Sequence, residues 1–293
     1  MTLLELISRD IVEIGRATRS VIDVPPYLGL IDPNSPSAWR SQAVVVASVA
    51  SVGGPGPVFF AIERLRSRFS DASRQLRFEL FDRYLPRHAS LLEAAGFLLR
   101  SVDPVLTVTR AIFAHSNHEF DRREVVTIID AFSDDSFRDY VCARRVAFGL
   151  RTEVPGREGA PVSDTAAVDL DEEVGAARRD ANSGRVRNAA IVASDCVASV
   201  AALQGTRRSA ELVGVGTIPE MRGRGYATAL CSHLIARHFA VGGTLVWLTA
   251  GSREAERMYR SLGFRRIGAN QYNYDDAPAV TQAEMRHFRR APE

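Results

Sequence analysis

Apolar residues recur along the chain with two periods, about two residues in some stretches and about 3.6 residues in others. The longer period predicts helices over 3–20, 62–69, 87–95, 134–148, 165–181, 252–262 and 281–290, and in the stretch that leads to residue 240. Short, mostly apolar runs predict strands over 43–49, 58–62, 76–81, 98–108, 125–129, 189–193, 197–203, 210–218 and 244–249, and a terminal strand pair or extension is expected over 265–274. A loop is expected over 24–36. Strands that alternate with helices predict an α/β fold.

The most informative stretch is 210–227, with the sequence A-E-L-V-G-V-G-T-I-P-E-M-R-G-R-G-Y-A. Its first part predicts a buried strand that ends at Pro219, because proline cannot donate a hydrogen bond to a sheet. A glycine-rich turn then opens a helix, and it consists of Arg222, Gly223, Arg224, Gly225, Tyr226 and Ala227. The N–H groups and the dipole of a helix start attract anions, and glycine lets a phosphate approach the backbone. The turn therefore predicts a phosphate site, although it matches neither a P-loop nor a dinucleotide-binding motif.

The order Arg-x-x-Gly-x-Ala, directly after a strand that ends in proline, resembles the pyrophosphate loop of the GNAT superfamily of acetyl-CoA-dependent N-acetyltransferases. Arg222, Gly225 and Ala227 match the family pattern of Arg or Gln, two residues, Gly, one residue, and Gly or Ala. The resemblance implies that 222–227 binds the pyrophosphate of coenzyme A. It also implies that acetyl-CoA is the acyl donor substrate and that the reaction uses no metal.

The same resemblance implies how the rest of the donor is held. In the family the pantetheine pairs its amides with the splayed end of the central strand, formed here by Val215, Gly216 and Thr217. The N–H of Val215 is then expected to face the thioester oxygen. The order of an antiparallel hairpin, a central strand, a helix, a parallel strand, a helix and a closing strand also resembles the GNAT fold. We therefore expect a mixed, mostly antiparallel sheet flanked by helices.

A second motif follows at 252–264, with the sequence S-R-E-A-E-R-M-Y-R-S-L-G-F. Its spacing predicts a helix that Ser252 caps and Gly263 ends. The pattern Ala-x-x-x-Tyr-x-x-Leu-Gly-Phe resembles the second GNAT motif, which implies that Tyr259 lies near the thioester sulfur and protonates the leaving thiolate. Without the resemblance, Tyr259 would be interpreted as a core residue. The family often has Asn where Ser252 stands, so the contact of Ser252 with pantetheine is expected to be weaker.

Glu211 is the predicted general base. It is an acid at the start of an otherwise apolar strand, where burial favours the protonated form up to higher pH, as a base that works near neutrality requires. In GNAT enzymes a glutamate on this strand often deprotonates the amine, usually through water. The alternative is a carboxylate that faces solvent or pairs with Arg207 or Arg208. Direct attack of the amine in a ternary complex is expected, because the cysteines are not placed for a covalent acyl-enzyme.

The two halves of the chain share a weak similarity. The sequence L-L-E-A-A-G-F at 91–97 resembles R-S-L-G-F at 260–264, but Leu92 occupies the position of Tyr259 and no Arg-Gly-x-Gly precedes it. The predicted organisation is a tandem of GNAT-like domains: a degenerate domain without a phosphate loop at 1–113, a polar linker at 114–123 and a catalytic acetyltransferase domain at 124–293. The alternative for the first half is an unrelated helical/β domain.

Composition narrows the class of protein. Of 293 residues, 46% are hydrophobic and 25% are charged, which is typical of a soluble globular protein with a core that needs no disulfides. Three cysteines lie far apart along the chain and indicate reduced thiols and a cytoplasmic location; they are Cys142, Cys196 and Cys231. A formal net charge of +2 does not favour a nucleic-acid partner.

Membrane and metal classes are not expected either. Residues 43–62 carry no charge, but the glycines and prolines of 53–57 interrupt them, so two short strands around a turn are expected instead of a membrane helix. The charged N-terminus does not resemble a signal peptide. His115 and His118 have neither a cysteine nor a third histidine nearby, so a metal site is not expected there.

The predicted function is N-acetylation of a primary amine, most simply that of a small molecule. Two alternatives stay open: a non-catalytic acyl-CoA-binding regulatory module, and an acetyltransferase that acts on a protein or peptide amine. The acceptor itself is not predicted, because specificity in this fold lies on the variable helix–loop before the hairpin, at about 141–181. The oligomeric state is also left open.

Overall fold

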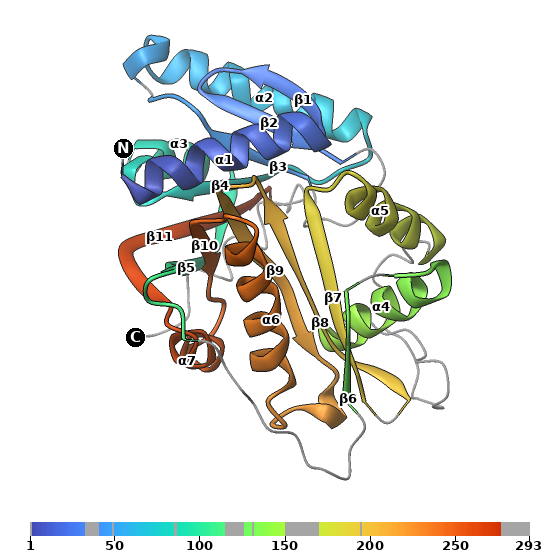
Figure 1. The fold of residues 1–293 in the computed structure, drawn as a ribbon. Helices are drawn as coiled ribbons and strands as arrows, with labels where there is room; N and C mark the ends of the chain where they lie inside the picture. The colour runs from blue at the N-terminus through green and yellow to red at the C-terminus, as the bar shows by residue number, and fades with distance from the viewer. Residues whose placement is uncertain are drawn as a thin grey trace, which may run out of the picture. The chain divides into compact units, whose positions relative to one another are not determined.

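The structure is a computed structural model that describes residues 2–32, 41–48, 50–84, 87–114, 126–130, 132–149, 170–193 and 195–276 (Figure 1). Tertiary contacts divide the chain into two compact units. The larger unit contains Met1–Ser20, Asp32–Ser37 and Asp103–Ala269, and the smaller unit contains Val21–Ile31, Ala38–Val102 and Asn270–Glu293. Each unit is an α/β structure with a mixed sheet.

The sheet of the larger unit has the order β5 (Phe97–Thr109), β10 (Leu245–Thr249), β9 (Ser209–Thr217), β8 (Cys196–Gly205), β7 (Val186–Ala193) and β6 (Val126–Ile129). Strands β9 and β10 are parallel, whereas the β5–β10, β6–β7, β7–β8 and β8–β9 pairs are antiparallel. Strand β5 enters this unit only with its second part, from residue 103. The predicted mixed, mostly antiparallel sheet is confirmed.

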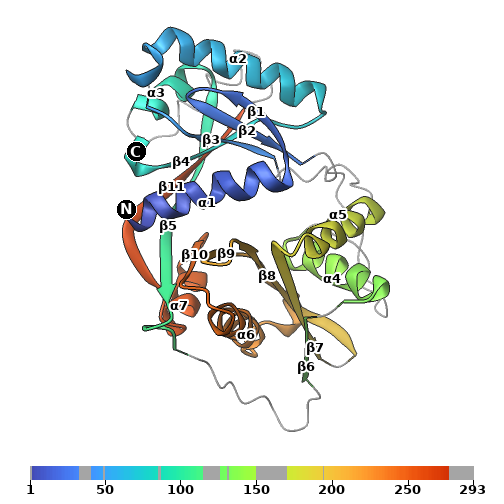
Figure 2. The same ribbon diagram turned by 45° about the horizontal axis from the view of Figure 1, so that its top comes forward.

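Helices cover both faces of this sheet. Helix α6 (Tyr226–Ala240) packs on β7, β8 and β9 from one face, while α4 (Asp134–Ala147) and α5 (Leu170–Asn182) pack on the opposite face (Figures 1 and 2). Helix α1 (Leu3–Thr18) packs on β8, and α7 (Arg253–Ser261) follows β10 along the chain. The apolar stripe of α6 is fully buried in the core of this unit, with Leu230, Cys231, Leu234 and Ile235 at helical spacing.

The sheet of the smaller unit has the order β1 (Ser20–Val24), β2 (Tyr27–Ile31), β3 (Gln42–Val45), β4 (Arg77–Phe81), β11 (Arg265–Asp276) and the first part of β5. Strands β3 and β4 are parallel, and the β2–β3 and β4–β11 pairs are antiparallel. Helices α2 (Pro55–Asp71) and α3 (Arg87–Ala94) connect these strands. The core contains edge-on rings, with the centroid of Phe78 at 4.7 Å from Tyr27 and 5.0 Å from Phe97.

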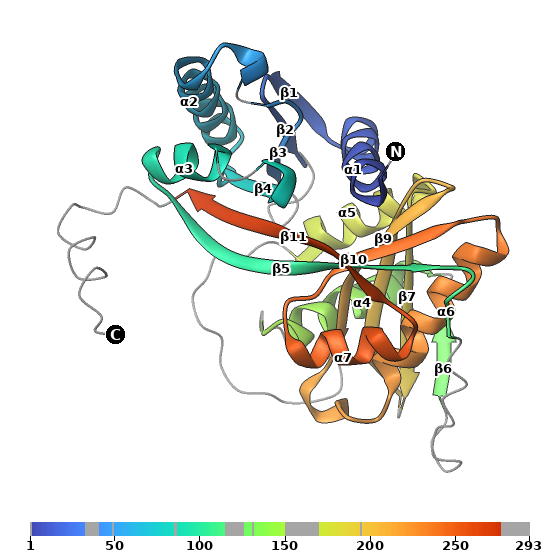
Figure 3. The same ribbon diagram turned by 90° about the vertical axis from the view of Figure 1, so that its left-hand side faces the viewer.

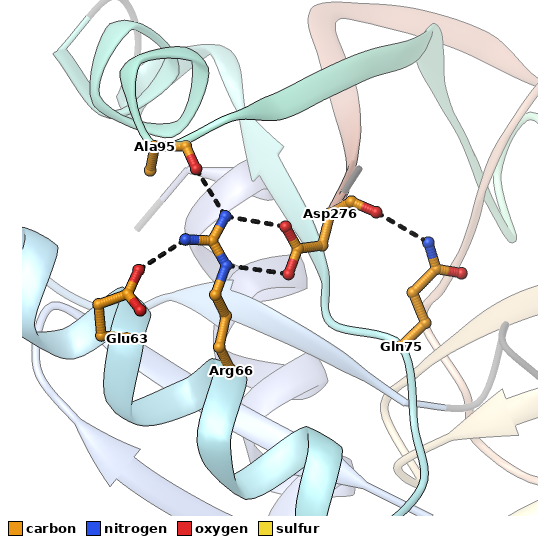
Figure 4. A network of polar contacts seen from close by, with 5 residues as sticks. All are labelled: Glu63, Arg66, Gln75, Ala95 and Asp276. Carbon is orange, nitrogen blue, oxygen red and sulfur yellow. Dashed lines mark hydrogen bonds and ion pairs between the residues drawn. The ribbon is translucent and has the colours of Figure 1, made fainter. Parts of the chain in front are cut away.

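An ion-pair network fastens the end of β11 to α2 within the smaller unit (Figure 4). The guanidinium of Arg66 donates to both carboxylate oxygens of Asp276, at 2.9 and 2.8 Å, and to Glu63 and the carbonyl of Ala95, both at 2.6 Å. Gln75 donates to the Asp276 carbonyl at 3.0 Å. Asp276 is the largest cause that raises the pKa of Arg66. A bidentate pair of this kind fixes geometry as well as charge, so it holds β11 in register.

The two halves of the chain repeat one order of elements. The series α1, β1, β2, β3, α2, β4, α3, β5 matches the series α5, β7, β8, β9, α6, β10, α7, β11. In each series a helix connects two parallel strands, β3 with β4 and β9 with β10. Strand β5, the last of the first series, pairs with β10 of the second series, and β11, the last of the second series, pairs with β4 of the first. Figure 3 shows both strands at full length. This repetition agrees with a tandem fold; the boundaries 1–113, 114–123 and 124–293 stay a prediction.

One strand prediction in the smaller unit is wrong. Residues 58–62 lie in α2, which begins at Pro55 after the N-cap Gly54. Proline has no N–H to lose in the first turn of a helix, so the Gly-Pro sequence starts this helix and does not interrupt it. The buried residues of α2 follow the helical period, at Val58, Ala61, Ile62, Leu65 and Phe69.

The predicted loop over 24–36 is also wrong, because Tyr27–Ile31 forms strand β2. All five residues of β2 are buried, so the strand lacks the alternation of apolar and polar residues that reveals a half-exposed strand. Gly29 marks a close approach, since a Cβ atom there would lie 2.7 Å from the side chain of Leu65 on α2.

Three other expectations concern a membrane helix, a C-terminal helix and a metal site. Within the described residues, every helix is too short or too polar to cross a membrane. The helix predicted over 281–290 lies outside the described residues. So do His115 and His118, and the described part of the chain contains no cluster of His, Cys, Asp or Glu that could hold a metal ion.

Candidate functional site

The predicted strand, turn and helix at 210–240 are confirmed in the larger unit. Strand β9 ends at Thr217, a short 3-10 helix covers Pro219–Met221, and α6 begins at Tyr226. The turn between them contains two glycines in the left-handed region, Gly223 with φ of 78° and Gly225 with φ of 80°. Gly225 is the N-cap of α6 and offers no side-chain hydrogen bond to the first turn. The backbone N–H groups of that turn are therefore suited to an anionic ligand.

Strand β9 changes its pairing just before this turn. Its register pairs with β10 join Ser209–Glu211 to Leu245–Trp247, and beyond these residues the two described strands have no register pairs with each other. Strand β9 nevertheless continues to Thr217. The edge of β9 that faces β10 is thus splayed from about residue 212 onward, and its backbone can pair with an extended ligand.

A β-bulge interrupts the other edge of β9 at the same place. The register passes from Ala202–Val213 to Val200–Gly216, so Gly214 and Val215 oppose a single residue of β8. Gly214 has a φ of 60°, which favours glycine. The bulge turns the backbone of Val215 out of the regular ladder.

The end of β9 is anchored by partly buried polar contacts. The hydroxyl of Ser199 donates to the carbonyl of Gly216 at 3.0 Å and lies 3.1 Å from the hydroxyl of Thr217. The N–H of Ile218 donates to the carbonyl of Ala198 at 3.0 Å. These contacts keep the splayed strand end rigid, as a site that must present its backbone to a ligand requires.

The predicted base, Glu211, lies at the last register pair between β9 and β10, opposite Trp247. It also lies opposite Gln204 of β8, whose amide donates to one carboxylate oxygen of Glu211 at 2.8 Å. Glu211 is half-buried. The carboxylate of Glu211 therefore has a hydrogen-bond partner on the neighbouring strand, Gln204. The expected alternatives, solvent or a pair with Arg207 or Arg208, do not include this partner.

The predicted acid, Tyr259, lies on α7. The hydroxyl of Ser252 accepts from the N–H of Ala255 at 3.1 Å, so the predicted N-cap is confirmed. The ring of Tyr259 packs edge-on against Phe264, with centroids 5.7 Å apart. Burial raises the pKa of the Tyr259 phenol well above its usual range, and the neighbouring Cys231 adds to this shift. The phenol is therefore protonated at neutral pH.

One protein-family sequence model covers all of these elements. Residues 162–264 match the sequence model of the acetyltransferase (GNAT) family, and this range includes the bulged strand, the glycine turn and the helix of Tyr259. Residues 162–264 form a GNAT domain. No curated protein matches the sequence significantly.

Solved structures show the same fold for nearly the whole chain. A GCN5-related N-acetyltransferase from Kribbella flavida has a TM-score of 0.68 at 22% identity and covers 97% of this chain and 99% of its own. A GCN5-related N-acetyltransferase from Sphaerobacter thermophilus has a TM-score of 0.59 at 18% identity, with 87% and 78% covered. A tandem GNAT protein from the clavulanic acid biosynthesis pathway has a TM-score of 0.54 at 12% identity, with 87% and 79% covered. At such identities the likeness concerns the fold.

Several polar contacts in the larger unit are not predicted from the sequence. Glu256 accepts two hydrogen bonds from Arg266, at 2.7 and 2.6 Å, and these are the main reason why the pKa of Glu256 lies below its usual range. This ion pair ties α7, and with it Tyr259, to β11. In the sequence, the only indication of this ion pair is that Glu256 lies on a predicted helix and Arg266 on the strand that follows it.

A buried carboxyl group was also missed. Asp10 of α1 is 2% exposed and accepts a hydrogen bond from the hydroxyl of Ser209, the first residue of β9. Burial raises the pKa of Asp10, and the Ser209 hydrogen bond partly opposes this. The two residues lie 199 positions apart, so no local pattern connects them.

Arg222 is exposed, yet its guanidinium donates two hydrogen bonds to backbone carbonyls of the same unit. Its Nε donates to the carbonyl of Thr217 at 3.1 Å, and a terminal nitrogen donates to the carbonyl of Ala147, the last residue of α4, also at 3.1 Å. A Cβ atom on Gly216 would lie 2.8 Å from that of Ala147 and 3.1 Å from the ring of Phe148. The end of α4 therefore lies directly on the splayed end of β9.

Proposed function

We propose that the GNAT domain transfers an acetyl group from acetyl-CoA to the primary amine of a small molecule. The observation that carries the proposal is the end of β9, which is splayed on the edge toward β10, bulged on the edge toward β8, and followed by a turn with two left-handed glycines at a helix start. A splayed edge suits the two amides of pantetheine, and the helix start suits the pyrophosphate. Both lie on one continuous stretch of backbone, as the linear shape of coenzyme A demands.

In this proposal the donor is held mainly by backbone groups. The N–H groups of Gly223, Gly225, Tyr226 and Ala227 hold the pyrophosphate, and Arg224 adds positive charge. The strand edge at Val215, Gly216 and Thr217 pairs with pantetheine, and Ser252 lies at the start of the helix that follows β10. Glycine at 223 and 225 lets the phosphates approach the main chain, since both residues have positive φ.

The transfer step is proposed to be a direct attack. The amine nitrogen forms a bond to the thioester carbon, Glu211 takes a proton from the amine directly or through water, and the carbonyl oxygen becomes an oxyanion. The N–H of Val215 donates to this oxyanion, and one such donor stabilises a transition state by about 3 kcal/mol in other enzymes. When the C–S bond breaks, the Tyr259 hydroxyl gives its proton to the thiolate of coenzyme A and is reprotonated from solvent.

A covalent acyl-enzyme is not part of the proposal. Cys231 is fully buried, and burial raises the pKa of its thiol far above the usual range, so the nucleophilic thiolate does not form. Cys142 is also buried, on α4. The remaining cysteine, Cys196, begins β8 at the end of the hairpin away from Glu211.

Thermal melting with acetyl-CoA, coenzyme A and ATP tests the proposal. A ligand that binds only the native state at 100 times its Kd stabilises it by about 2.7 kcal/mol, which raises the Tm by several degrees. We expect a rise with both coenzyme A species and none with ATP. No rise with either coenzyme A species would remove the main support for the transferase.

Turnover separates the proposed enzyme from the two alternatives. Release of coenzyme A thiol is measured with panels of free amines and, separately, with intact proteins and peptides. An enzyme for small amines releases thiol with free amines and loses this activity in Glu211→Gln and Tyr259→Phe. A regulatory module binds acetyl-CoA without turnover, and a protein-directed enzyme turns over only with macromolecular amines.

A further inference from the structure

Arg222 lies in the proposed phosphate turn, but its side chain donates hydrogen bonds to two carbonyls of the protein itself. Its guanidinium bridges the carbonyl of Thr217 at the end of β9 and the carbonyl of Ala147 at the end of α4. Both acceptors are backbone groups at the C-terminal ends of their elements. A helix C-terminus carries partial negative charge, which a cation stabilises. The side chain is thus placed to join two elements of the larger unit.

The joined elements are in close contact. Gly216 has no side chain, and the space a Cβ atom would take lies 2.8 Å from the Cβ of Ala147 and 3.1 Å from the ring of Phe148. Phe148 is the C-cap of α4 and is 54% exposed. An exposed aromatic ring therefore lies on the same backbone segment that the proposed function assigns to pantetheine.

We propose that Arg222 is a positioning residue that tethers the end of α4 to the splayed end of β9, so that Phe148 forms an apolar wall beside the pantetheine. This inference rests on the proposed function and deepens it, because it assigns the first arginine of the phosphate turn to the pantetheine part of the donor. The phosphates are left to the backbone N–H groups and to Arg224. The planar guanidinium suits this task, since its donors point in fixed directions and can serve two carbonyls at once.

The competing interpretation is that Arg222 binds a phosphate of coenzyme A by its charge. Two properties separate the interpretations. Lysine keeps the charge but lacks the planar fork, so Arg222→Lys preserves a charge contact and loses the bridge. Salt weakens a charge contact with phosphate and has little effect on hydrogen bonds to neutral carbonyls.

The experiment measures the Kd of coenzyme A by calorimetry for the wild type, Arg222→Lys, Arg222→Ala and Phe148→Ala, and for the double variant with alanine at 222 and 148. Each Kd is measured from about 50 mM to about 500 mM salt, a range over which screening of exposed charges changes strongly. Arg224→Ala serves as the reference for a charge contact, and Arg265→Ala, which removes an exposed arginine at the start of β11, as the control for a general loss of charge.

We expect Arg222→Lys and Arg222→Ala to weaken coenzyme A binding alike, by about tenfold, because both lose hydrogen bonds from a charged donor. The salt dependence of Kd stays that of the wild type. Phe148→Ala weakens binding by a similar factor, and the double variant is no weaker than either single one, because both remove the same wall. Melting temperatures of the unliganded variants show that each is folded at the temperature of the titration.

Three results would overturn the tether. Wild-type affinity in Arg222→Lys, together with a flatter salt dependence in Arg222→Ala, would assign Arg222 to a phosphate. Losses that multiply to about a hundredfold in the double variant would mean that Arg222 and Phe148 act independently. Wild-type affinity in Arg222→Ala would mean that the bridge has no role in binding. If the wild type itself binds no coenzyme A, the proposed function fails, which is a separate outcome.

Discussion

At the scale of single residues, Tyr259 carries the proposed acid role. A tyrosine phenol is protonated at neutral pH and burial raises the pKa of this one further, so a proton is present for the leaving thiolate. Tyr259→Phe keeps the ring against Phe264 and removes only this proton. We expect the rate of a single turnover to fall by about a hundredfold, a usual contribution of general acid catalysis, with the Kd of coenzyme A unchanged. An unchanged single-turnover rate would contradict the acid role.

Asp10 gives a prediction about stability and pH. Burial is the largest cause that raises its pKa in the folded protein, so the folded state holds the proton more tightly than the unfolded state. The stability that the protonated carboxyl provides is complete below the ordinary pKa of Asp and is lost as pH rises through the folded value. Asp10→Asn stays neutral and does not lose it.

The measurement for Asp10 compares urea unfolding of both proteins between about pH 4 and about pH 7. We expect the free energy of unfolding of Asp10→Asn to rise relative to the wild type as the pH rises. Glu172→Gln removes an exposed carboxylate on α5 and serves as the control for the loss of one negative charge. A constant difference across the range would mean that Asp10 does not titrate in the folded protein with a raised pKa.

At the scale of elements, two glycines end two helices of the larger unit under different constraints. Gly263 follows α7 with φ of 90°, and a Cβ atom there would lie 2.1 Å from the carbonyl oxygen of Ile112. Gly242 follows α6 with φ of 94°, and no atom lies within 4 Å of such a Cβ position. Both therefore favour glycine for conformational reasons, but only Gly263 also has no room.

This pair predicts unequal costs. Gly242→Ala should lower the free energy of unfolding by about 1 kcal/mol, the cost of a left-handed residue with a Cβ. Gly263→Ala should lower it by about 3 kcal/mol or more, because the backbone must also shift. Chemical unfolding of both variants gives the comparison. Equal losses would show that the contact with Ile112 relaxes freely.

At the scale of the whole molecule, the larger unit needs residues from the first half of the chain. Val105–Thr109 of β5 pair with Leu245–Thr249 of β10, and α1 packs on β8. A chain that begins at residue 114 therefore leaves the apolar strand L-V-W-L-T with an open edge. Open apolar edges pair with other chains.

We expect the chain from 114 to 293 to aggregate and to bind no coenzyme A. Co-expression with residues 1–113 should restore a soluble complex that melts as the full chain does. Size-exclusion chromatography of both samples makes the comparison. A monomeric 114–293 with the Tm of the full chain would mean that β5 and α1 are dispensable for the larger unit.

The local sequence determined the elements of the candidate site. Glycines with positive φ at 223 and 225, a proline after β9 and the 3.6-residue period of α6 and α7 act within a few residues, so they are visible in one chain. The fold class followed from the same local patterns. The prediction fails where local signals mislead or are missing. Pro55 and Pro57 suggest a turn but start α2, and β2 is buried on both faces and so shows no alternation of apolar and polar residues.

Only the tertiary structure decided which distant groups meet. Asp10 reaches Ser209 across 199 positions, Arg222 reaches Ala147 across 75, and β5 and β11 each contribute to both units. Such contacts depend on how the faces of helices and sheets pack, and many residues together determine that packing. The residues around one partner in the sequence do not reveal the other partner. The sequence therefore determined that a glycine-rich turn opens α6, and the packing of α4 on β9 decided what the first arginine of that turn contacts.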